Sequence, residues 1–109
     1  MGWQTPPTQK AHLQILQNSY RAFIAVDTTC NQVVGFVTAI SDGVLSAYIP
    51  LLEVAAPYQG KGIGTRLLQL VLDECKNFYM VDICHDQGLA SYYAKFGALK
   101  SHASIFRNR

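Results

Sequence analysis

The sequence has few charged residues and no long apolar run. Only 15% of its 109 residues are charged, against about 25% in a typical soluble domain. The net charge of +2 is too small to indicate a nucleic-acid or membrane surface. No apolar run approaches the length of a membrane span, and the N-terminus has no apolar signal core. Because so little charge covers the surface, we expect a homodimer with neither a nucleic-acid nor a membrane partner.

Cysteine is also scarce. Cys30, Cys75 and Cys84 form an odd set without the spacing of a metal site, and Cys75 falls on a helix core position. This pattern favours free thiols in a reducing compartment and predicts no bound metal. The first residues resemble a myristoylation signal, but Pro6 stands where serine or threonine is needed. We therefore expect a cytoplasmic protein with one domain over residues 1–109.

The first half of the sequence predicts a helix followed by antiparallel strands. Residues 5–19 open with a threonine and two prolines and continue at helical spacing, which indicates a short helix. Two stretches rich in β-branched and aromatic residues, 20–27 and 33–40, flank a turn-rich segment and predict a hairpin. A third strand is expected at about 45–54, after an Asp-Gly turn.

The second half predicts a βαβ unit. A one-sided apolar stripe indicates a helix over 62–77, and the short apolar segment 79–84 indicates a buried strand. Its two strands should be parallel with a right-handed crossover. A second helix is expected over 88–97, and the tail 98–109 should supply a last strand. The predicted fold class is α/β: a single mixed, mostly antiparallel sheet with one parallel βαβ unit and helices packed on it.

Three of the eight glycines stand at the entrance of the helix predicted over 62–77. Gly60, Gly62 and Gly64 do not fit the Walker pattern, and Thr65 replaces the last glycine of the dinucleotide pattern. The pattern Q-x-x-G-x-G is filled without a gap, beginning at Gln59. A flexible turn before a helix is the alternative, and the flanking βαβ context makes it the weaker interpretation.

Physical chemistry explains what such a cluster does. The first N–H groups of a helix have no partner within the helix, and that end carries about half a positive charge. Glycines remove side chains, so a pyrophosphate can approach several backbone N–H groups. Lys61 and Arg66 add positive charge at the same end. The pattern therefore predicts an anion-binding helix N-terminus.

The segment "YIPLLEVAAPYQGKGIGTRLLQLVLDEC", followed by "YMVDICHD" and "YYAKFGA", resembles the GNAT superfamily of N-acetyltransferases. The match runs from Arg21 to Gly97. The resemblance implies an acyl-CoA N-acyltransferase-like fold whose two parallel strands splay apart. It implies acetyl-CoA as co-substrate, with its pantetheine arm paired to the backbone around Leu52 and Val54. Its pyrophosphate would lie on Gln59, Gly60, Lys61, Gly62, Ile63, Gly64 and Thr65.

Acetyl transfer to an amine needs a base and an oxyanion contact. Glu53 is the best base candidate, because strand alternation puts it on one face with Ala47, Ile49 and Leu51. A carboxylate on an apolar surface suits general base catalysis, directly or through a water. The alternatives are that Glu53 points into solvent at a strand end or pairs with an arginine. The Val54 N–H is our candidate for the oxyanion contact.

The departing thiolate needs a hydrogen-bond donor, and the resemblance places Tyr93 opposite the sulfur. A phenol of pKa about 10 would protonate a thiolate of about 8.5 only against roughly 2 kcal/mol. Tyr93 should therefore act mainly as a hydrogen-bond donor. Tyr93 and Tyr92 both lie on an apolar stripe, so a purely structural role in the core is the alternative.

The remaining histidines and the Cys-His-Asp run at 84–86 indicate no separate site. Adjacent strand residues point to opposite faces, so the three side chains of that run cannot converge on one atom. We expect strand-end residues near the cofactor there, and His12 and His102 show no partner pattern.

Two functions remain open from the sequence. The first is transfer of an acetyl group from acetyl-CoA to a primary amine of a small molecule or peptide. The second is a CoA-binding regulatory or protein-interaction module without turnover. The sequence matches the family without its usual first strand and helix and its longer last strand pair, which normally shape the acceptor pocket. We expect a dimer partner to rebuild that wall, or an open site.

Overall fold

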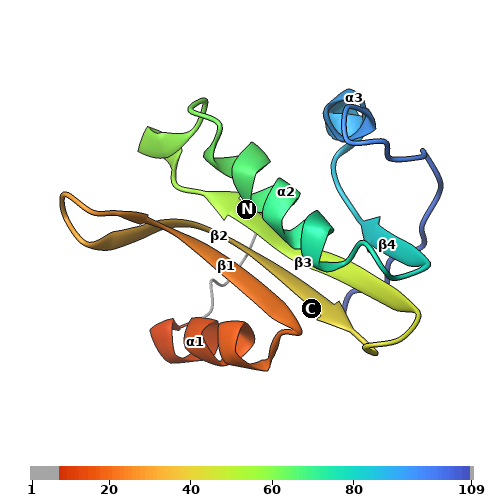
Figure 1. Cartoon of the computed structure of the whole chain (residues 1–109), viewed down its shortest axis with the longest axis horizontal. Helices are drawn as coiled ribbons and strands as arrows, with labels where there is room; N and C mark the ends of the chain where they lie inside the picture. Colours follow the sequence, from red (N-terminus) through yellow and green to blue (C-terminus); the bar gives the residue numbers. More distant parts are fainter. Residues whose placement is uncertain (1–7, 109) are drawn as a thin grey trace.

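The computed structural model describes residues 8–108 of the chain. Four strands form one sheet, and three helices and two short 3-10 turns connect or cover it (Figure 1). The elements in chain order are α1 (Gln9–Asn18), β1 (Arg21–Asp27), β2 (Gln32–Ser41), β3 (Ser46–Val54), η1 (Ala56–Tyr58), α2 (Ile63–Glu74), β4 (Met80–Ile83), η2 (Gln87–Leu89) and α3 (Ala90–Ala94).

The sheet has the order β1-β2-β3-β4. β1 pairs with β2 and β2 with β3 in antiparallel fashion, whereas β3 and β4 are parallel. The parallel pair needs a crossover, and α2 supplies it. The predicted fold class is thus confirmed: a mixed, mostly antiparallel sheet with one parallel βαβ unit.

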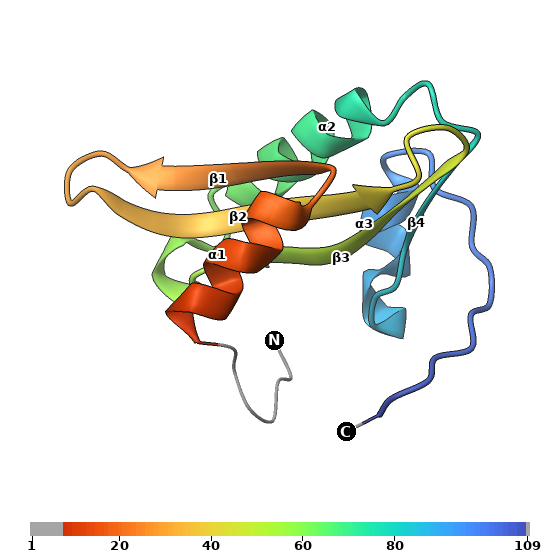
Figure 2. The same cartoon turned by 90° about the horizontal axis from the view of Figure 1, so that it is seen from below.

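Helices α1 and α2 lie on opposite faces of the sheet (Figure 2). Alternation along β2 explains why both faces attract a helix. Val37 and Ala39 are fully buried on the face that α2 covers, while Phe36 points to the α1 face and its ring lies 6.2 Å from that of His12. The two faces therefore have separate apolar surfaces, which a two-residue period on a strand makes possible.

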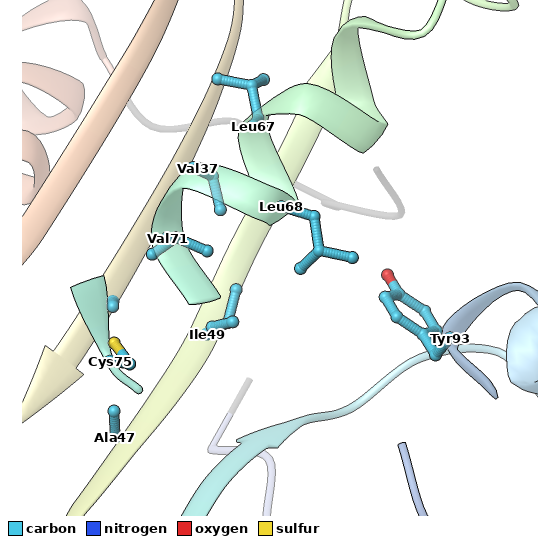
Figure 3. Packing of buried hydrophobic residues seen from close by; sticks show 9 residues of the cluster. Val37, Ala47, Ile49, Leu67, Leu68, Val71, Cys75 and Tyr93 are labelled. Atoms are coloured by element: carbon cyan, nitrogen blue, oxygen red, sulfur yellow. The ribbon is translucent and has the colours of Figure 1, made fainter. Parts of the chain in front are cut away.

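The main core lies between α2 and the sheet. Leu67, Leu68 and Val71 of α2 are buried against strand residues, and Cys75 closes the C-terminal end of the helix with no exposed surface (Figure 3). This matches the one-sided stripe and the buried Cys75 that the sequence predicted. In contrast, no residue of α1 is fully buried.

Strand β3 carries a bulge. Tyr48 pairs with Ile40 and Leu51 with Thr38, so three steps along β3 match two along β2. Pro50 lies between Tyr48 and Leu51, where the extra residue is inserted. Within a sheet, proline is found mainly at bulges and on edge strands. The pairing of β3 with β4 also ends here, at Ile49 opposite Ile83. Beyond the bulge β3 continues without β4 beside it.

Two sequence expectations need correction. The tail forms no strand: residues 98–108 are irregular and exposed, and Leu99 and Phe106 keep about nine-tenths of their surface. The tail therefore contributes little apolar surface to the core, which is what would hold a further strand in place. The helix expected over 88–97 is reduced to α3 after a 3-10 turn. The predicted start of the first helix, residues 5–7, lies outside the described residues; α1 is capped by Thr8, whose hydroxyl accepts from the Ala11 N–H at 3.1 Å.

Candidate active site

The loop before α2 has a backbone that only glycine adopts readily. Gly60 and Gly62 have φ angles of 77° and 84°, in the left-handed region. Gly62 is also the N-cap of α2, so no side chain caps the helix there. Two of the three clustered glycines are thus explained by the turn itself.

The N-terminus of α2 presents unpartnered backbone donors. The Arg66 N–H makes the first intrahelical bond, to the Gly62 carbonyl at 3.0 Å, which leaves the N–H groups of Ile63, Gly64 and Thr65 without a partner inside the helix. Lys61 and Arg66 are exposed at this end. Positive charge and bare amides therefore coincide, as an anion site requires.

Gly64 is a different case from its two neighbours. Its φ is not in the left-handed region, and an added Cβ would lie 3.7 Å from the nearest Val54 methyl, an ordinary contact. Neither the backbone nor the packing of the described residues requires glycine at this position. A small residue here leaves room in front of the helix N-terminus, which is what a bound anion would need.

The loop is tied to the hairpin of β1 and β2. The Tyr58 hydroxyl donates to Asp27 Oδ2 at 2.6 Å, and the Ala55 N–H donates to the Val34 carbonyl at 2.8 Å. Hydrogen bonds from Thr29 and Tyr58 lower the pKa of Asp27 to about 2. The same bond to Asp27 raises the pKa of Tyr58 to about 12. These bonds fix the loop that precedes the bare helix end.

Gln59 begins the glycine motif, but its side chain points back to the sheet. Its amide donates to the Val54 carbonyl at 2.9 Å. The bond joins the loop to the last residue of β3. The Gln59 side chain therefore holds the loop against the sheet and does not point toward the anion site. Lys61 lies over the Tyr58 ring, with Nζ 5.6 Å from the ring centre.

The backbone of β3 beyond the bulge faces an open edge. The Ala55 N–H bonds to β2, at Val34, and in an antiparallel pair every second residue turns its N–H and C=O toward the partner strand. Leu52 and Val54 therefore turn their N–H and C=O groups away from β2, toward the side where β4 has ended. This edge adjoins the N-terminus of α2, since a Cβ added at Gly64 would lie 3.7 Å from a Val54 methyl.

Glu53 lies on the opposite face from the one predicted. Ala47 and Ile49 are buried under α2, whereas Glu53 pairs with Phe36 across the strands and lines a pocket beside α1. The predicted shared face with Ala47 and Ile49 is wrong, because the bulge adds one residue and inverts the alternation after it. Leu52 and Val54 accordingly pack toward the α2 core instead.

The pocket around Glu53 has a volume of about 580 Å³. It lies between α1 and strands β2 and β3, on the face opposite α2. Its polar lining side chains are Gln9, His12 and Glu53, and apolar side chains supply most of the remaining wall, among them Leu13, Leu16, Val33 and Phe36. The volume lies within the range of small-molecule sites, and a single carboxylate in such a wall can bind and deprotonate an amine.

Tyr93 lies on the other side of the sheet from this pocket. It is 8% exposed and belongs to the core cluster, and its hydroxyl points toward Leu68 of α2 (Figure 3). Burial, followed by the neighbouring Tyr92, raises the pKa of Tyr93. The phenol therefore stays protonated at neutral pH and can donate a hydrogen bond. Tyr93 is therefore a core residue, as the structural alternative expected, and its role as a donor to the thiolate stays a prediction.

Two contacts of this region were not expected from the sequence. The His85 ring stacks on the Tyr93 ring at 4.6 Å, and the hydroxyls of Tyr92 and Thr65 lie 2.9 Å apart. His85 lies two residues after Ile83, the last residue of β4, so strand alternation does not apply to it. His12, which we gave no role, lines the pocket of Glu53. The sequence signal that could have indicated this position is the spacing of His12 and Leu16: residues four apart lie on the same side of a helix, and both line the pocket.

Metal and membrane features were searched over the same part of the chain. Within residues 8–108, no group of three histidine, cysteine or acidic side chains is arranged to hold a metal ion. None of the described helices combines the length and apolar character that crossing a bilayer demands.

The part of the sequence that carries the glycine loop, strand β3 and the pocket matches a known family. The model of the acetyltransferase (GNAT) family matches residues 1–98 of this sequence. The chain belongs to the GNAT family. Comparison with curated protein sequences gives no match. The family uses acetyl-CoA for acetyl transfer.

Solved structures agree with the family. A candidate acetyltransferase from Deinococcus radiodurans is 38% identical with a TM-score of 0.92, over 98% of this chain and 74% of that one. A GNAT acetyltransferase from Streptococcus pneumoniae is 27% identical with a TM-score of 0.77, over 94% of this chain and 81% of that one. Glucosamine-6-phosphate N-acetyltransferase from Arabidopsis thaliana, 15% identical with a TM-score of 0.72 over 90% of this chain and 74% of that one, shares the fold alone.

Proposed function

We propose that this GNAT protein transfers an acetyl group from acetyl-CoA to a primary amine. One observation carries the proposal: β3 loses its parallel neighbour at Ile49, and the open edge that follows lies between the bare N-terminus of α2 and the pocket of Glu53. A long, anionic thioester and an amine could thus approach one short stretch of strand from two directions.

The residues present fit acetyl-CoA. Bare N–H groups of Ile63, Gly64 and Thr65, with Lys61 nearby, would bind the diphosphate. The outward backbone groups of Leu52 would pair with an amide-containing arm as a neighbouring strand does, and Val54 would meet the acyl end of the ligand through its N–H, since its carbonyl already accepts from the Gln59 amide. When bound, acetyl-CoA supplies an activated acetyl thioester.

Glu53 would take the proton that the amine loses. A free alkyl ammonium has a pKa near 10.4, so the amine must be deprotonated before it attacks. The carboxylate reaches the pocket from β3, directly between the two outward-facing residues Leu52 and Val54. An amine held there lies close to the strand edge. A carboxylate in an apolar wall both attracts the ammonium and accepts its proton.

Two other groups would stabilise charge. The Val54 N–H faces the open edge and can donate to the oxyanion that develops on the acetyl carbon. Tyr93 can donate to the departing thiolate, but since its pKa is raised, full proton transfer is opposed by more than the roughly 2 kcal/mol of an ordinary phenol. His85 holds the Tyr93 ring by stacking on it.

The homodimer remains a prediction, and an exposed apolar patch supports it. Val44, Leu45, Tyr79 and Met80 are all exposed, and the Met80 N–H donates to the Leu45 carbonyl, so they gather at one end of the sheet. Such patches commonly mark interaction surfaces. Light scattering at high micromolar concentration should give a dimer, and Tyr79→Lys should shift it toward monomer. A monomeric parent protein would refute the prediction. The cytoplasmic location likewise remains an expectation.

Calorimetry with coenzyme A tests the proposed cradle. Gly64→Asp puts an anion at the second position of α2, where it favours the helix but repels a diphosphate. Gly64→Asn is the matched control of equal size without the charge. We expect Gly64→Asp to weaken binding more than tenfold relative to Gly64→Asn, with no loss of thermal stability. Equal affinities in the two variants would show that the diphosphate binds elsewhere.

An activity assay separates an enzyme from a binding module. Thiol release from acetyl-CoA should depend on an added primary amine, and mass spectrometry should show the amine 42 Da heavier, roughly one acetyl group in place of one hydrogen. Tight coenzyme A binding with no thiol release for any amine would favour the CoA-binding module instead.

A further inference from the structure

A hydrogen bond between two hydroxyls joins α3 to the first turn of α2. The hydroxyl oxygens of Thr65 and Tyr92 lie 2.9 Å apart, and both side chains are partly buried. Thr65 is the third residue of α2, and its N–H is one of the three bare donors at this helix end. The bond therefore reaches from α3 to the edge of the site proposed for the diphosphate.

The number of protons in this pair decides what else it can do. A hydroxyl has one proton to donate and lone pairs with which to accept, so a bond between two hydroxyls leaves one proton over. A phenol is a stronger donor than an aliphatic alcohol, which favours Tyr92 as donor and Thr65 as acceptor. Within residues 8–108, the Thr65 hydroxyl makes no second hydrogen bond, such as the one to the carbonyl four residues earlier that a helical threonine often forms. The Thr65 proton is then available to a ligand.

The surroundings of this proton suit an anion. It belongs to the same helical turn as the bare N–H groups of Ile63 and Gly64, and Lys61 precedes that turn. A hydroxyl donor beside the backbone donors gives one more hydrogen bond to a group rich in acceptor oxygens. Hydrogen bonds to an ionised acceptor are also the stronger kind.

We infer that Tyr92 is a positioning residue for the co-substrate: it donates to the Thr65 hydroxyl, whose own proton then points to the diphosphate. The inference rests on the proposed function, since it takes the N-terminus of α2 as the diphosphate site. Tyr92 acts through Thr65 and does not itself touch the diphosphate.

The Tyr92 ring makes contacts that do not depend on its hydroxyl. It meets the Tyr93 ring edge to face at 5.1 Å and 81°, and the Phe96 ring at 5.3 Å and 60°. These are ordinary aromatic contacts. Tyr92→Phe therefore keeps the support of Tyr93 and removes the hydroxyl alone, so it should weaken binding of the co-substrate without slowing the chemical step.

A double-mutant cycle measured by calorimetry with coenzyme A tests the link between the two hydroxyls. We expect Tyr92→Phe to weaken binding about 3- to 10-fold, and Thr65→Val, of similar shape but without a hydroxyl, about 10- to 100-fold. Thr65→Ser should stay within about threefold of the parent. In the Thr65→Val background, Tyr92→Phe should change the affinity by about twofold or less, because no hydroxyl remains to be oriented. Equal losses in both backgrounds would overturn the inference.

A ligand without the diphosphate separates positioning from a general structural role. Pantetheine shares the arm of coenzyme A but lacks its phosphates, so Tyr92→Phe should bind it as the parent does in an NMR titration. A loss of the same size for pantetheine and coenzyme A would show that Tyr92 only shapes the protein, against the inference. With an amine that is acetylated, Tyr92→Phe should raise KM for acetyl-CoA and leave kcat within about twofold.

The failure of this inference can be told from the failure of the proposed function. If the parent protein does not bind coenzyme A, both are wrong. If the parent binds it and Tyr92→Phe binds it equally well, the inference alone is overturned. If the cycle behaves as expected but no amine is acetylated, the transfer activity fails, and the role of Tyr92 in binding coenzyme A stands.

Discussion

The two faces of the sheet are built differently. Under α2 the contact is closed: Leu67, Leu68 and Val71 are almost wholly buried. Beside α1 no helix residue is fully buried, and a pocket of about 580 Å³ remains between helix and sheet. The strands between them supply side chains to both faces by alternation (Figure 2).

The difference separates stability from specificity. The closed face holds the helix whose N-terminus would bind the diphosphate, and a rigid support suits a site that must keep its N–H groups aligned. The open face holds the carboxylate and the room for an acceptor. Substitutions on one face should therefore affect folding, and substitutions on the other should affect turnover.

The strongest expected effect is on turnover, from Glu53→Gln. Removing the proton acceptor of the open face should lower kcat/KM by about 10²–10⁴-fold, because the amine then loses its proton without a base. The melting temperature should change little. Glu74→Gln, at an exposed carboxylate beside Arg21, is the control and should retain activity. Steady-state kinetics measures both, and full turnover of Glu53→Gln would remove the base assignment.

The closed face is tested by Leu67→Ala. Deleting this 3% exposed side chain should lower the free energy of unfolding by about 2–5 kcal/mol, since a cavity remains under α2. The same deletion at Leu13, which is 53% exposed on α1, should cost within about 1 kcal/mol. Urea unfolding followed by circular dichroism compares them. Equal losses would mean that α1 contributes as much core as α2.

A smaller effect is expected from Tyr93→Phe. Loss of a hydrogen bond to a thiolate is worth about 1.5–3 kcal/mol, so kcat should fall by roughly 10- to 150-fold. Tyr92→Phe is the matched control: its hydroxyl meets Thr65, and its loss should raise KM for acetyl-CoA more than it lowers kcat. If Tyr93→Phe kept full turnover, Tyr93 would be a core residue only.

The smallest effect concerns the loop that joins the two faces. Hydrogen bonds from Thr29 and, second, from Tyr58 lower the pKa of Asp27 to about 2, and the bond to Asp27 raises the pKa of Tyr58 to about 12; Tyr58→Phe removes the Tyr58 bond alone. Because the pKa of Asp27 is depressed, its share of stability is present above about pH 4 and lost as the pH falls toward 2. The share of Tyr58 is lost between about pH 10 and 12. Thermal melts should show the variant slightly less stable at pH 7, with a smaller difference from the parent at pH 2; a difference that stays the same or grows at pH 2 would contradict this.

Several elements were predictable from local patterns. The apolar stripe over 62–77 gave the α2 helix within three residues at its C-terminal end, and the strands of the hairpin were placed within one residue at each end. Periodicity predicts these elements because one face of each is buried by its neighbours. The strand predicted for the tail was wrong: residues 98–108 form no strand and are exposed, because no neighbouring element covers their apolar side chains.

Other features depended on long-range contacts. Pro50 could have indicated a bulge, but the sequence does not show that β2 and β3 pair with one extra residue there. Without that register, Glu53 is assigned to the wrong face. His85 and Tyr93 are eight positions apart in the chain, and only the end of β4 and the turn after it bring their rings together.

The sequence by itself determined most of the helices and strands, the family and the glycine motif, because helix period, strand period and backbone freedom are local properties. The tertiary structure decided which face Glu53 occupies, where β3 loses its neighbour, and which side chains line the pocket. Those depend on the register between strands and on the packing of α1 and α2, and one extra residue in a strand inverts every side chain that follows it.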